Sequence, residues 1–328
     1  ISICIILSNM LISFIIPCFN AAKTLDSVVA SIENTCTVPY EIIMVNDGST
    51  DGTEDVAKKI ANRSNAFLFS QTNKGVNAAR KLGWNKANGD YVCFVDADDS
   101  VILNDEILAW LFKDYDIVKA GGWYLTDKQR INYDNIFIGE VYDVASAYNL
   151  LLSSRLLPYI HSAFFRKGII TDECFNIDSR FKIGEDLLFN IKVMASCHKF
   201  ISVPERFYVY SMNEESVMHT KIWGFNYIRD FNDEIDKHIL ALCPKLKKQL
   251  IKHRFIDYTS TLLFPEIKMV NAYYKETVEL LNENPWLKKV TPMKYVLFIE
   301  NECLYKMYVS IFRFVQRLRR KKQRIVID

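Results

Sequence analysis

Apolar and polar positions along the first part of the chain follow the pattern of an α/β protein. Short apolar runs rich in β-branched and aromatic residues alternate with stretches of helical periodicity, and turn-forming residues separate them. The predicted strands are 11–16, 40–45, 66–69 and 91–95, and the predicted helices are 24–34, 54–62 and 73–87. Strands that alternate with helices indicate a doubly wound, mostly parallel sheet.

The pattern then changes twice. Shorter strands are predicted at 116–120, 122–125, 136–138, 159–165 and 207–210, with helices at 144–152 and 187–196. Beyond residue 221 the periodicity is helical, and prolines divide it into several helices. We therefore expect an α/β domain over residues 1–220 and a helical C-terminal region over 221–328.

The chain begins with an apolar stretch that does not resemble a signal peptide. The apolar stretch from Ile1 to Ile16 contains polar residues, runs into Pro17, and lacks the charged start and small-residue cleavage site of a signal peptide. It is also short for a membrane span. Since Met10 directly precedes the first predicted strand, we expect translation to begin there and residues 1–10 to be an upstream extension.

Composition limits the class of partner. The chain has 328 residues, of which 50% are hydrophobic, and a formal net charge of +2. This near-neutral charge gives no support for nucleic-acid binding as the main role, so no nucleic-acid partner is expected. The eight cysteines show no CxxC or other metal-ligand spacing. We expect reduced thiols and a cytoplasmic protein.

The most informative stretch is the acidic turn after the strand that ends at Val95. Asp96, Asp98 and Asp99 crowd four positions at the carboxyl end of that strand, where open α/β sheets bind ligands. Carboxylates this close repel each other unless a cation or hydrogen-bond donors neutralise them. Hard oxygen ligands favour Mg²⁺ or Mn²⁺, so the turn predicts such a cofactor. A solvated turn that caps the next helix is the alternative.

Four further segments accompany this turn in a fixed order along the chain. Together the five are 13–20, 45–53, 73–80, 96–99 and 184–189. In this order they resemble the successive signatures of family-2 glycosyltransferases, covering roughly residues 11–220. One departure is Phe19, where the family typically has Tyr, so that a stacking face remains without its hydroxyl.

The resemblance implies a fold and an activity. The fold is the GT-A α/β nucleotide-sugar-binding domain, followed here by the helical region. The activity is metal-dependent, inverting transfer of a sugar from a nucleotide-diphosphate donor, of the UDP-sugar type, to a saccharide or lipid-linked acceptor in cell-surface polysaccharide synthesis.

The resemblance also assigns donor-side residues. They are Pro17, Phe19, Asn20, Asp47, Lys74, Arg80, Asp96 and Ala97. Pro17 and Phe19 would offer an apolar wall to a uracil ring, and Asp47 would accept a base N–H. Lys74 and Arg80 would contact the diphosphate or the base. An Asx-turn role for Asp47 and a surface position for Lys74 are alternatives.

Metal and acceptor roles follow in the same way. Asp98 is the expected metal ligand, and His219 is a candidate for a metal or phosphate contact. Asp186 is the expected general base, with Glu185 as an orienting or acceptor-binding group, although adjacent acidic residues at a helix start also serve as ordinary caps. For His161, which alternates with apolar neighbours, a structural role is favoured.

Two other classes remain as alternatives. One is a nucleotide-sugar-binding protein that has lost its chemistry, and the intact Asp96, Asp98 and Asp186 argue against it. The other is a nucleotidyltransferase, which usually carries a Gly-rich phosphate loop after the first strand, unlike Pro17 and its neighbours. GxGxxG and Walker motifs do not occur in the sequence.

The end of the chain combines an apolar helical face with a basic cluster. The apolar positions are Leu304, Met307, Tyr308, Ile311, Phe312 and Val315, and the basic ones are Arg317, Arg319, Arg320, Lys321, Lys322 and Arg324. Such a segment is typical of peripheral binding to a membrane surface, here the inner face of the cell membrane. A packed helix with a solvated basic tail is the alternative.

Overall fold

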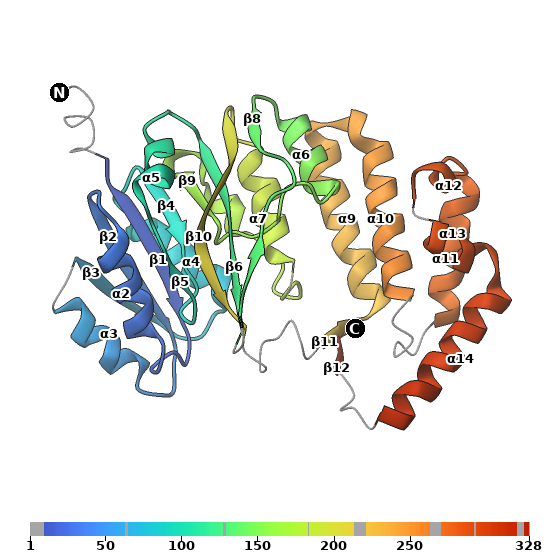
Figure 1. The fold of residues 1–328 in the computed structure, drawn as a ribbon, viewed down its shortest axis with the longest axis horizontal. Coiled ribbons are helices and arrows are strands. Elements are labelled where there is room, and N and C mark those ends of the chain that lie inside the picture. The colour runs from blue at the N-terminus through green and yellow to red at the C-terminus, as the bar shows by residue number, and fades with distance from the viewer. Residues whose placement is uncertain are drawn as a thin grey trace. The chain divides into compact units, whose positions relative to one another are not determined.

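A computed structural model describes most of the chain. The described residues are 10–62, 65–126, 129–182, 184–212, 221–262, 270–291, 293–319 and 325–327. The chain separates into two compact units, residues 1–212 and 213–328, whose elements are labelled in Figure 1.

The first unit is built on a ten-stranded sheet with the order β3-β2-β1-β4-β9-β6-β10-β5, in which β7 also pairs with β6 and β8 with β10. The strands are β1 Ile12–Cys18, β2 Tyr40–Asp47, β3 Ala66–Gln71, β4 Tyr91–Phe94, β5 Ser100–Val101, β6 Ile117–Leu125, β7 Arg130–Tyr133, β8 Gly139–Val141, β9 Ala163–Arg166 and β10 Phe200–Ser211. The strands from β3 to β4 are parallel, as are β6 and β10. Strand β9 runs antiparallel to both β4 and β6. The expected mostly parallel α/β sheet is confirmed, with antiparallel pairs in its second half.

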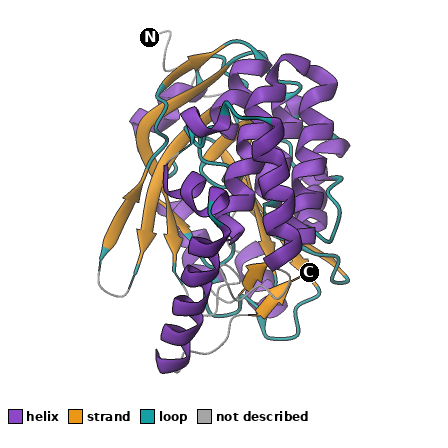
Figure 2. Cartoon of the chain, turned by 90° about the vertical axis from the view of Figure 1, so that its right-hand side faces the viewer, coloured by secondary structure: helices purple, strands orange, loops and turns teal. Residues whose placement is uncertain are grey.

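Helices of the first unit pack on this sheet (Figure 1), and Figure 2 shows the helices in purple and the strands in orange. The helices of the first unit are α2 Leu25–Thr35, α3 Thr53–Ala61, α4 Val76–Lys86, α5 Asp105–Leu111, α6 Val144–Leu152 and α7 Glu185–Met194, with short 3₁₀ turns at Lys167–Ile169 and Asp172–Phe175. Strand β1 is buried on both faces, which explains its continuous apolar run. Its Phe14 packs in the core that includes α2, while Ile15 lies against Gly83 of α4. A Cβ at Gly83 would come within 2.4 Å of Ile15, so this glycine allows α4 to approach the sheet closely.

The second unit is helical, as expected. Its elements are α9 Phe225–Leu242, a 3₁₀ turn at Pro244–Leu246, α10 Lys247–Leu262, α11 Val270–Glu283, α12 Leu287–Val290, α13 Met293–Glu300 and α14 Glu302–Arg319, with the parallel pair β11 Lys221–Trp223 and β12 Ile325–Ile327. Phe255, Leu281 and Tyr305 belong to its own apolar core. Among the helices that the structure describes, none is both long and apolar enough to cross a bilayer.

Several predicted boundaries were wrong, each for a local reason. The predicted strand 136–138 is a loop in which Ile136 is 73% exposed, so its apolar residues were misread as strand residues. The predictions 116–120 and 122–125 form the single strand β6, which continues through Gly121. Strand β1 continues through Pro17 to Cys18. It can include a proline there because β4 pairs with β1 only as far as Ile15. Pro17 therefore pairs only with Val45 of β2, and its missing N–H costs no bond to β4.

Candidate active site

The loops that follow the parallel strands meet at one edge of the sheet, where hydrogen bonds join them. The side chain of Asn20, after β1, accepts a hydrogen bond from the Thr50 N–H at 2.9 Å, and the Asn20 N–H donates to Ser49 Oγ at 3.0 Å. Thr24 Oγ1 donates to the carbonyl of Ala97, after β4, at 2.6 Å. Asn20, a predicted donor-side residue, therefore fixes two loops to each other.

Asp47, at the end of β2, is buried and holds the loop before α4. Its Oδ1 accepts hydrogen bonds from the Lys74 N–H and from Gln71 Nε2, both at 2.8 Å. Its Oδ2 accepts one from the Gly75 N–H, also at 2.8 Å. Gly75 has a φ of 88°, a left-handed conformation that favours glycine. The carboxylate thus shapes the loop that carries the exposed side chain of Lys74.

Arg80, on α4, joins the two carboxylates expected on opposite sides of the reaction. Its Nη2 lies 3.1 Å from Asp96 Oδ1, and its Nη1 lies 3.0 Å from Asp186 Oδ1. Arg80 is only 3% exposed. Burial alone would lower its pKa, but Asp186 and Asp96 outweigh burial and raise it. The guanidinium is therefore a fixed buried cation, unlike the exposed side chain of Lys74.

The acidic turn divides into a buried part and an exposed part. Asp99 is buried, and its two oxygens accept hydrogen bonds from the Tyr208 hydroxyl at 2.6 Å and the Ser211 N–H at 2.8 Å, both on β10. The Tyr208 oxygen in turn accepts a bond from the Asp96 N–H at 3.1 Å. Burial, with a contribution from Asp96 and Asp98, raises the pKa of Asp99 to about 8. Asp99 supports the loop, and the carboxylate of Asp98 is exposed.

A divalent cation fits the chemistry of this turn. Asp98 offers an exposed carboxylate beside Asp96, and Mg²⁺ is commonly held by one or two carboxylates together with substrate phosphates. Within the described ranges, no three His, Cys, Asp or Glu side chains form a ready metal cluster. The other predicted ligand, His219, lies outside the described residues.

The second pair of carboxylates begins helix α7. Gly184 is the N-cap with a φ of 84°, and Glu185 and Asp186 occupy the first turn. Asp186 Oδ2 accepts a hydrogen bond from the Ile160 N–H at 3.2 Å, while its Oδ1 faces Arg80. Burial, followed by the charge of Asp186, raises the pKa of Glu185 to about 8. The two neighbours therefore differ, since Asp186 is paired with a cation, whereas burial beside Asp186 favours the protonated form of Glu185.

Lys119 and Asn190 support this helix start and were missed by the sequence analysis. Asn190 Nδ2 donates to the backbone carbonyl of Asp186 at 2.8 Å. Lys119 Nζ donates to the Tyr159 carbonyl at 2.9 Å and to Asn190 Oδ1 at 3.3 Å. Burial lowers the pKa of Lys119 to about 8, against the opposing charge of Asp186. A lysine within the apolar run of β6 was the signal that could have identified it, because buried lysines are rare without partners.

His161 is buried, but within the described residues its Nε2 has no hydrogen-bond partner, so the structural role favoured for it stays a prediction. Its ring lies between those of Tyr159 and Tyr208, with centroid distances of 4.9 and 4.2 Å and interplanar angles of 17° and 21°. Burial lowers its pKa to about 4, so the imidazole is neutral near pH 7. Phe19, in contrast, is 51% exposed at the end of β1.

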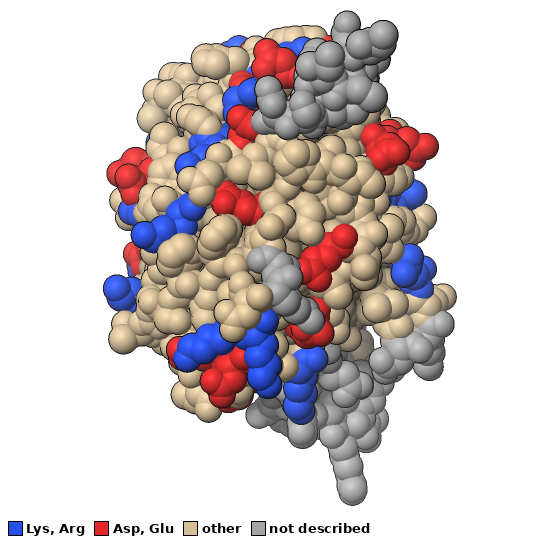
Figure 3. Space-filling view, turned by 90° about the vertical axis from the view of Figure 1, so that its left-hand side faces the viewer, with Lys and Arg blue, Asp and Glu red and all other residues tan. Residues whose placement is uncertain are grey.

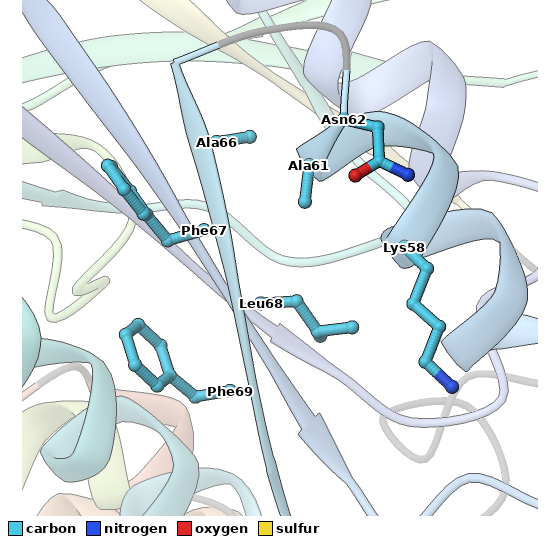
Figure 4. Close-up of a pocket in the computed structure, with 7 residues that line it drawn as sticks. All are labelled: Lys58, Ala61, Asn62, Ala66, Phe67, Leu68 and Phe69. Carbon is cyan, nitrogen blue, oxygen red and sulfur yellow. The ribbon is translucent and has the colours of Figure 1, made fainter.

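A cavity of about 640 Å³ lies elsewhere, at the sheet edge formed by β3 (Figure 4). It is lined by Lys58, Ala61, Asn62, Ala66, Phe67, Leu68 and Phe69. These residues come from the end of α3 and from β3, whereas Asp47 and the acidic turn lie at the carboxyl ends of β2 and β4. On the face of the molecule seen in Figure 3, Lys and Arg are interspersed with Asp and Glu. The cavity contains no pair of acidic or nucleophilic groups, so the candidate site remains at the carboxyl edge.

Part of the chain matches a known family model. Residues 13–137 match the family model described as glycosyl transferase family 2. This match includes β1 to β4, the acidic turn and Arg80, and it ends before α7.

Two curated relatives extend beyond that range. A glycosyltransferase named GlyA of Streptococcus pneumoniae is 27% identical over 74% of this chain, and the match spans only 36% of that longer protein. A cholesterol galactosyltransferase of Borreliella burgdorferi is 24% identical, and the match covers 94% of this chain and 93% of the relative.

Among solved structures, S. aureus TarS in complex with UDP has a similar fold. The TM-score is 0.59 at 18% identity, and the match covers 87% of this chain and 82% of the TarS chain. The same protein in complex with UDP-GlcNAc also matches with a TM-score of 0.59. At this level of identity the likeness concerns the fold.

Proposed function

The chain carries a family-2 glycosyltransferase domain of the GT-A fold, and from that premise we propose that it transfers a sugar, with inversion, from a UDP-sugar to a hydroxyl of a saccharide or lipid-linked acceptor. The synthesis of a bacterial cell-surface polysaccharide is the proposed setting. UDP and UDP-GlcNAc are bound by TarS, whose fold is similar, and this supports the choice of donor.

The observation that carries the proposal is the pair of ion contacts made by Arg80. One buried guanidinium joins Asp96 of the donor-side turn to Asp186 of the acceptor-side helix. Transfer needs the acceptor hydroxyl to meet the anomeric carbon of a bound donor, and holding the reacting groups in position lowers the barrier. Arg80 is thus proposed as a positioning residue that keeps the two sides of the site together, in place of the diphosphate contact expected from the sequence.

The donor would lie along the loops joined by Asn20. The exposed ring of Phe19 offers a stacking face to the uracil, and Asp96 and Ala97 lie at the end of β4, where the ribose is proposed to bind. Lys74 projects from the loop that Asp47 shapes and supplies positive charge for the diphosphate. Asp47 is proposed to act on the nucleotide by fixing this loop.

Mn²⁺ or Mg²⁺ is the proposed cofactor, and Asp98 would be its main protein ligand. When bound, the ion supplies Lewis-acid stabilisation of the negative charge on the departing diphosphate. Asp96 is less suited to be the main ligand because Arg80 already pairs with its Oδ1. His219 stays a proposed further contact.

Asp186 is the proposed general base. A sugar hydroxyl is a weak nucleophile at neutral pH, so a carboxylate must take its proton as the new bond forms. The ion contact with Arg80 holds the Asp186 carboxylate in a fixed position at the start of α7. Burial raises the pKa of Glu185 and so favours its protonated form, which can donate a hydrogen bond and orient the acceptor.

A turnover assay tests this function against its alternatives. Wild-type protein is incubated with a panel of nucleotide sugars and Mn²⁺, and the products are identified by mass spectrometry. Release of UDP from a UDP-sugar supports a glycosyltransferase. Binding of the donor without any turnover would support a protein that has lost its chemistry, and pyrophosphate formation from UTP and a sugar phosphate would support a nucleotidyltransferase.

The C-terminal segment is proposed to bind an anionic membrane surface. Met307 and Ile311 on α14 are 55% and 56% exposed, and the sequence continues into the basic residues Arg317 to Arg324. Exposed apolar side chains next to basic residues suit the boundary between lipid headgroups and acyl chains. The basic positions 320–324 lie outside the described residues.

A further inference from the structure

A cluster of six rings lies beside the candidate site. Its members are Tyr124, Tyr133, Tyr159, His161, Tyr208 and Tyr210. They come from β6, β7, β10 and the segment before β9, which the sheet brings together. None of the five tyrosines has a role in the proposed transfer as described above, apart from the contacts of Tyr208 with the acidic turn.

Glycine at position 122 makes room for this cluster. Gly122 pairs with Tyr133 on β7, and a Cβ at Gly122 would lie 2.4 Å from the Tyr133 hydroxyl oxygen. The Tyr133 ring can therefore cross β6, where its hydroxyl lies 2.7 Å from Ser162 Oγ. From there it contacts the rings of Tyr124 at 4.7 Å and Tyr159 at 5.6 Å, measured between centroids.

The stack within this cluster connects both sides of the reaction. Tyr208, at one end, contacts Asp96 and Asp99 of the donor-side turn through its hydroxyl. Tyr159, at the other end, directly precedes Ile160, whose N–H bonds to Asp186. His161 lies between the two rings. Tyr159 is thus at the end of the stack nearest the proposed base.

The rings differ in their access to solvent. Tyr133, His161 and Tyr208 are buried, whereas Tyr124 and Tyr159 are only partly buried. The hydroxyl oxygens of Tyr124 and Tyr159 lie 2.7 Å apart, and one hydrogen bond between two hydroxyls uses one of their two hydrogens. One face of Tyr159 is covered by His161, so the pair combines the remaining, partly exposed ring surface with hydrogen-bonding capacity at its rim.

We propose that Tyr124 and Tyr159 form a platform for a pyranose ring of the acceptor, so that the acceptor is a saccharide or carries one at its reactive end. A pyranose presents a C–H face and a rim of hydroxyls, and this matches aromatic faces bordered by phenolic oxygens. The inference rests on the proposed transfer function. The acceptor is favoured over the donor sugar because Tyr159 lies next to the contact with Asp186, while the donor-side turn is contacted by the buried Tyr208.

The test compares substitutions that remove a hydroxyl or a whole ring. Tyr124→Phe, Tyr159→Phe and Tyr159→Ala are assayed for transfer from the active UDP-sugar to soluble methyl glucoside, galactoside and N-acetylglucosaminide probes. The acceptor KM is expected to rise by about two- to tenfold, most in Tyr159→Ala, with little change in the donor KM. Saturation-transfer NMR with the same glycosides and UDP should lose the signals from the sugar C–H protons in Tyr159→Ala.

Tyr142→Ala is the matched control, since Tyr142 is 63% exposed and lies between β8 and α6, outside the cluster. Thermal unfolding identifies any variant that is misfolded, and the Phe variants keep the ring if Tyr159→Ala fails to fold. An unchanged acceptor KM in all three variants would overturn the platform, as would a rise confined to the donor KM. Wild-type protein that binds UDP but gives no glycoside signal would also overturn it. If UDP-sugars neither bind nor turn over, the proposed function itself fails.

Discussion

Arg80, which is buried, and Asp186, which is partly buried, form an ion pair with Nη1 and Oδ1 3.0 Å apart, although 106 positions separate them in the sequence. The same guanidinium holds Asp96. Since one cation serves two carboxylates, its removal should affect both stability and chemistry.

Arg80→Met should therefore destabilise the first unit by about 1–3 kcal/mol, because two partly buried carboxylates would lose the cation to which they are hydrogen-bonded. Urea unfolding of the variant measures this free energy. Lys81→Met is the matched control, since the neighbouring Lys81 pairs with Asp172 at the surface and should contribute about 1 kcal/mol or less. Equal effects of the two substitutions would contradict a central role for Arg80.

Asp98→Ala should abolish Mn²⁺-dependent donor turnover, because the ion would lose its main protein carboxylate. Titration of Mn²⁺ by calorimetry in the presence of UDP measures the loss of affinity directly. Asp105→Ala provides a control, since Asp105 is an acidic residue at the start of α5, away from the end of β4. Wild-type Mn²⁺ affinity in Asp98→Ala would show that the metal is held by other residues.

The raised pKa of Glu185 should lower the free energy of unfolding as the pH rises from about 5 to 8. Its pKa is raised to about 8 in the folded state, so between its unfolded value and pH 8 the folded protein binds more protons than the unfolded chain. The contribution can approach about 1.4 kcal/mol per pH unit. Glu185→Gln removes it, and the difference in unfolding free energy between variant and wild type should grow across this range. A difference independent of pH would mean that Glu185 is ionised in the fold.

Met307→Glu combined with Ile311→Glu should weaken association with anionic vesicles, because both side chains are exposed on the apolar face of α14. Substitution is preferable to deletion after Leu304, since Tyr305 is buried and its hydroxyl bonds to the Leu262 carbonyl. Vesicle co-sedimentation measures the binding, with Leu242→Glu on α9 as an exposed control. Neutralising the basic residues should cost about 1 kcal/mol each. Equal sedimentation of all proteins would argue for a packed helix with a solvated tail.

The sequence predicted the fold better than the site. The strands from β1 to β4 follow from short apolar runs between turn formers, and their parallel arrangement places the acidic turn and Asp47 at one edge. In contrast, 136–138 was misread because isolated exposed isoleucines resemble a strand. Local pattern carries this information only where one face is consistently buried.

The contacts of the site depend on residues far apart in the chain. Arg80 was expected to contact the diphosphate or the base because it brings positive charge near a helix start, and its partners Asp96 and Asp186 could be found only from the tertiary structure. The same holds for Lys119, which supports the start of α7 from β6 through Asn190. Gly122 alone does not indicate the aromatic cluster, because its role depends on the position of the Tyr133 ring, which only the tertiary structure shows.

The central claim is that Asp186 takes the proton of the acceptor hydroxyl while Glu185 only orients the acceptor. The most direct measurement is the rate of sugar transfer by Asp186→Asn and Glu185→Gln, each with the affinity for the UDP-sugar determined in parallel. Asp186→Asn keeps the shape of the side chain but cannot accept the proton, so transfer should fall by about 10²–10⁴-fold with donor affinity near that of the wild type. Glu185→Gln should lower transfer much less. Near-normal transfer by Asp186→Asn together with an inactive Glu185→Gln would contradict the account and exchange the two roles.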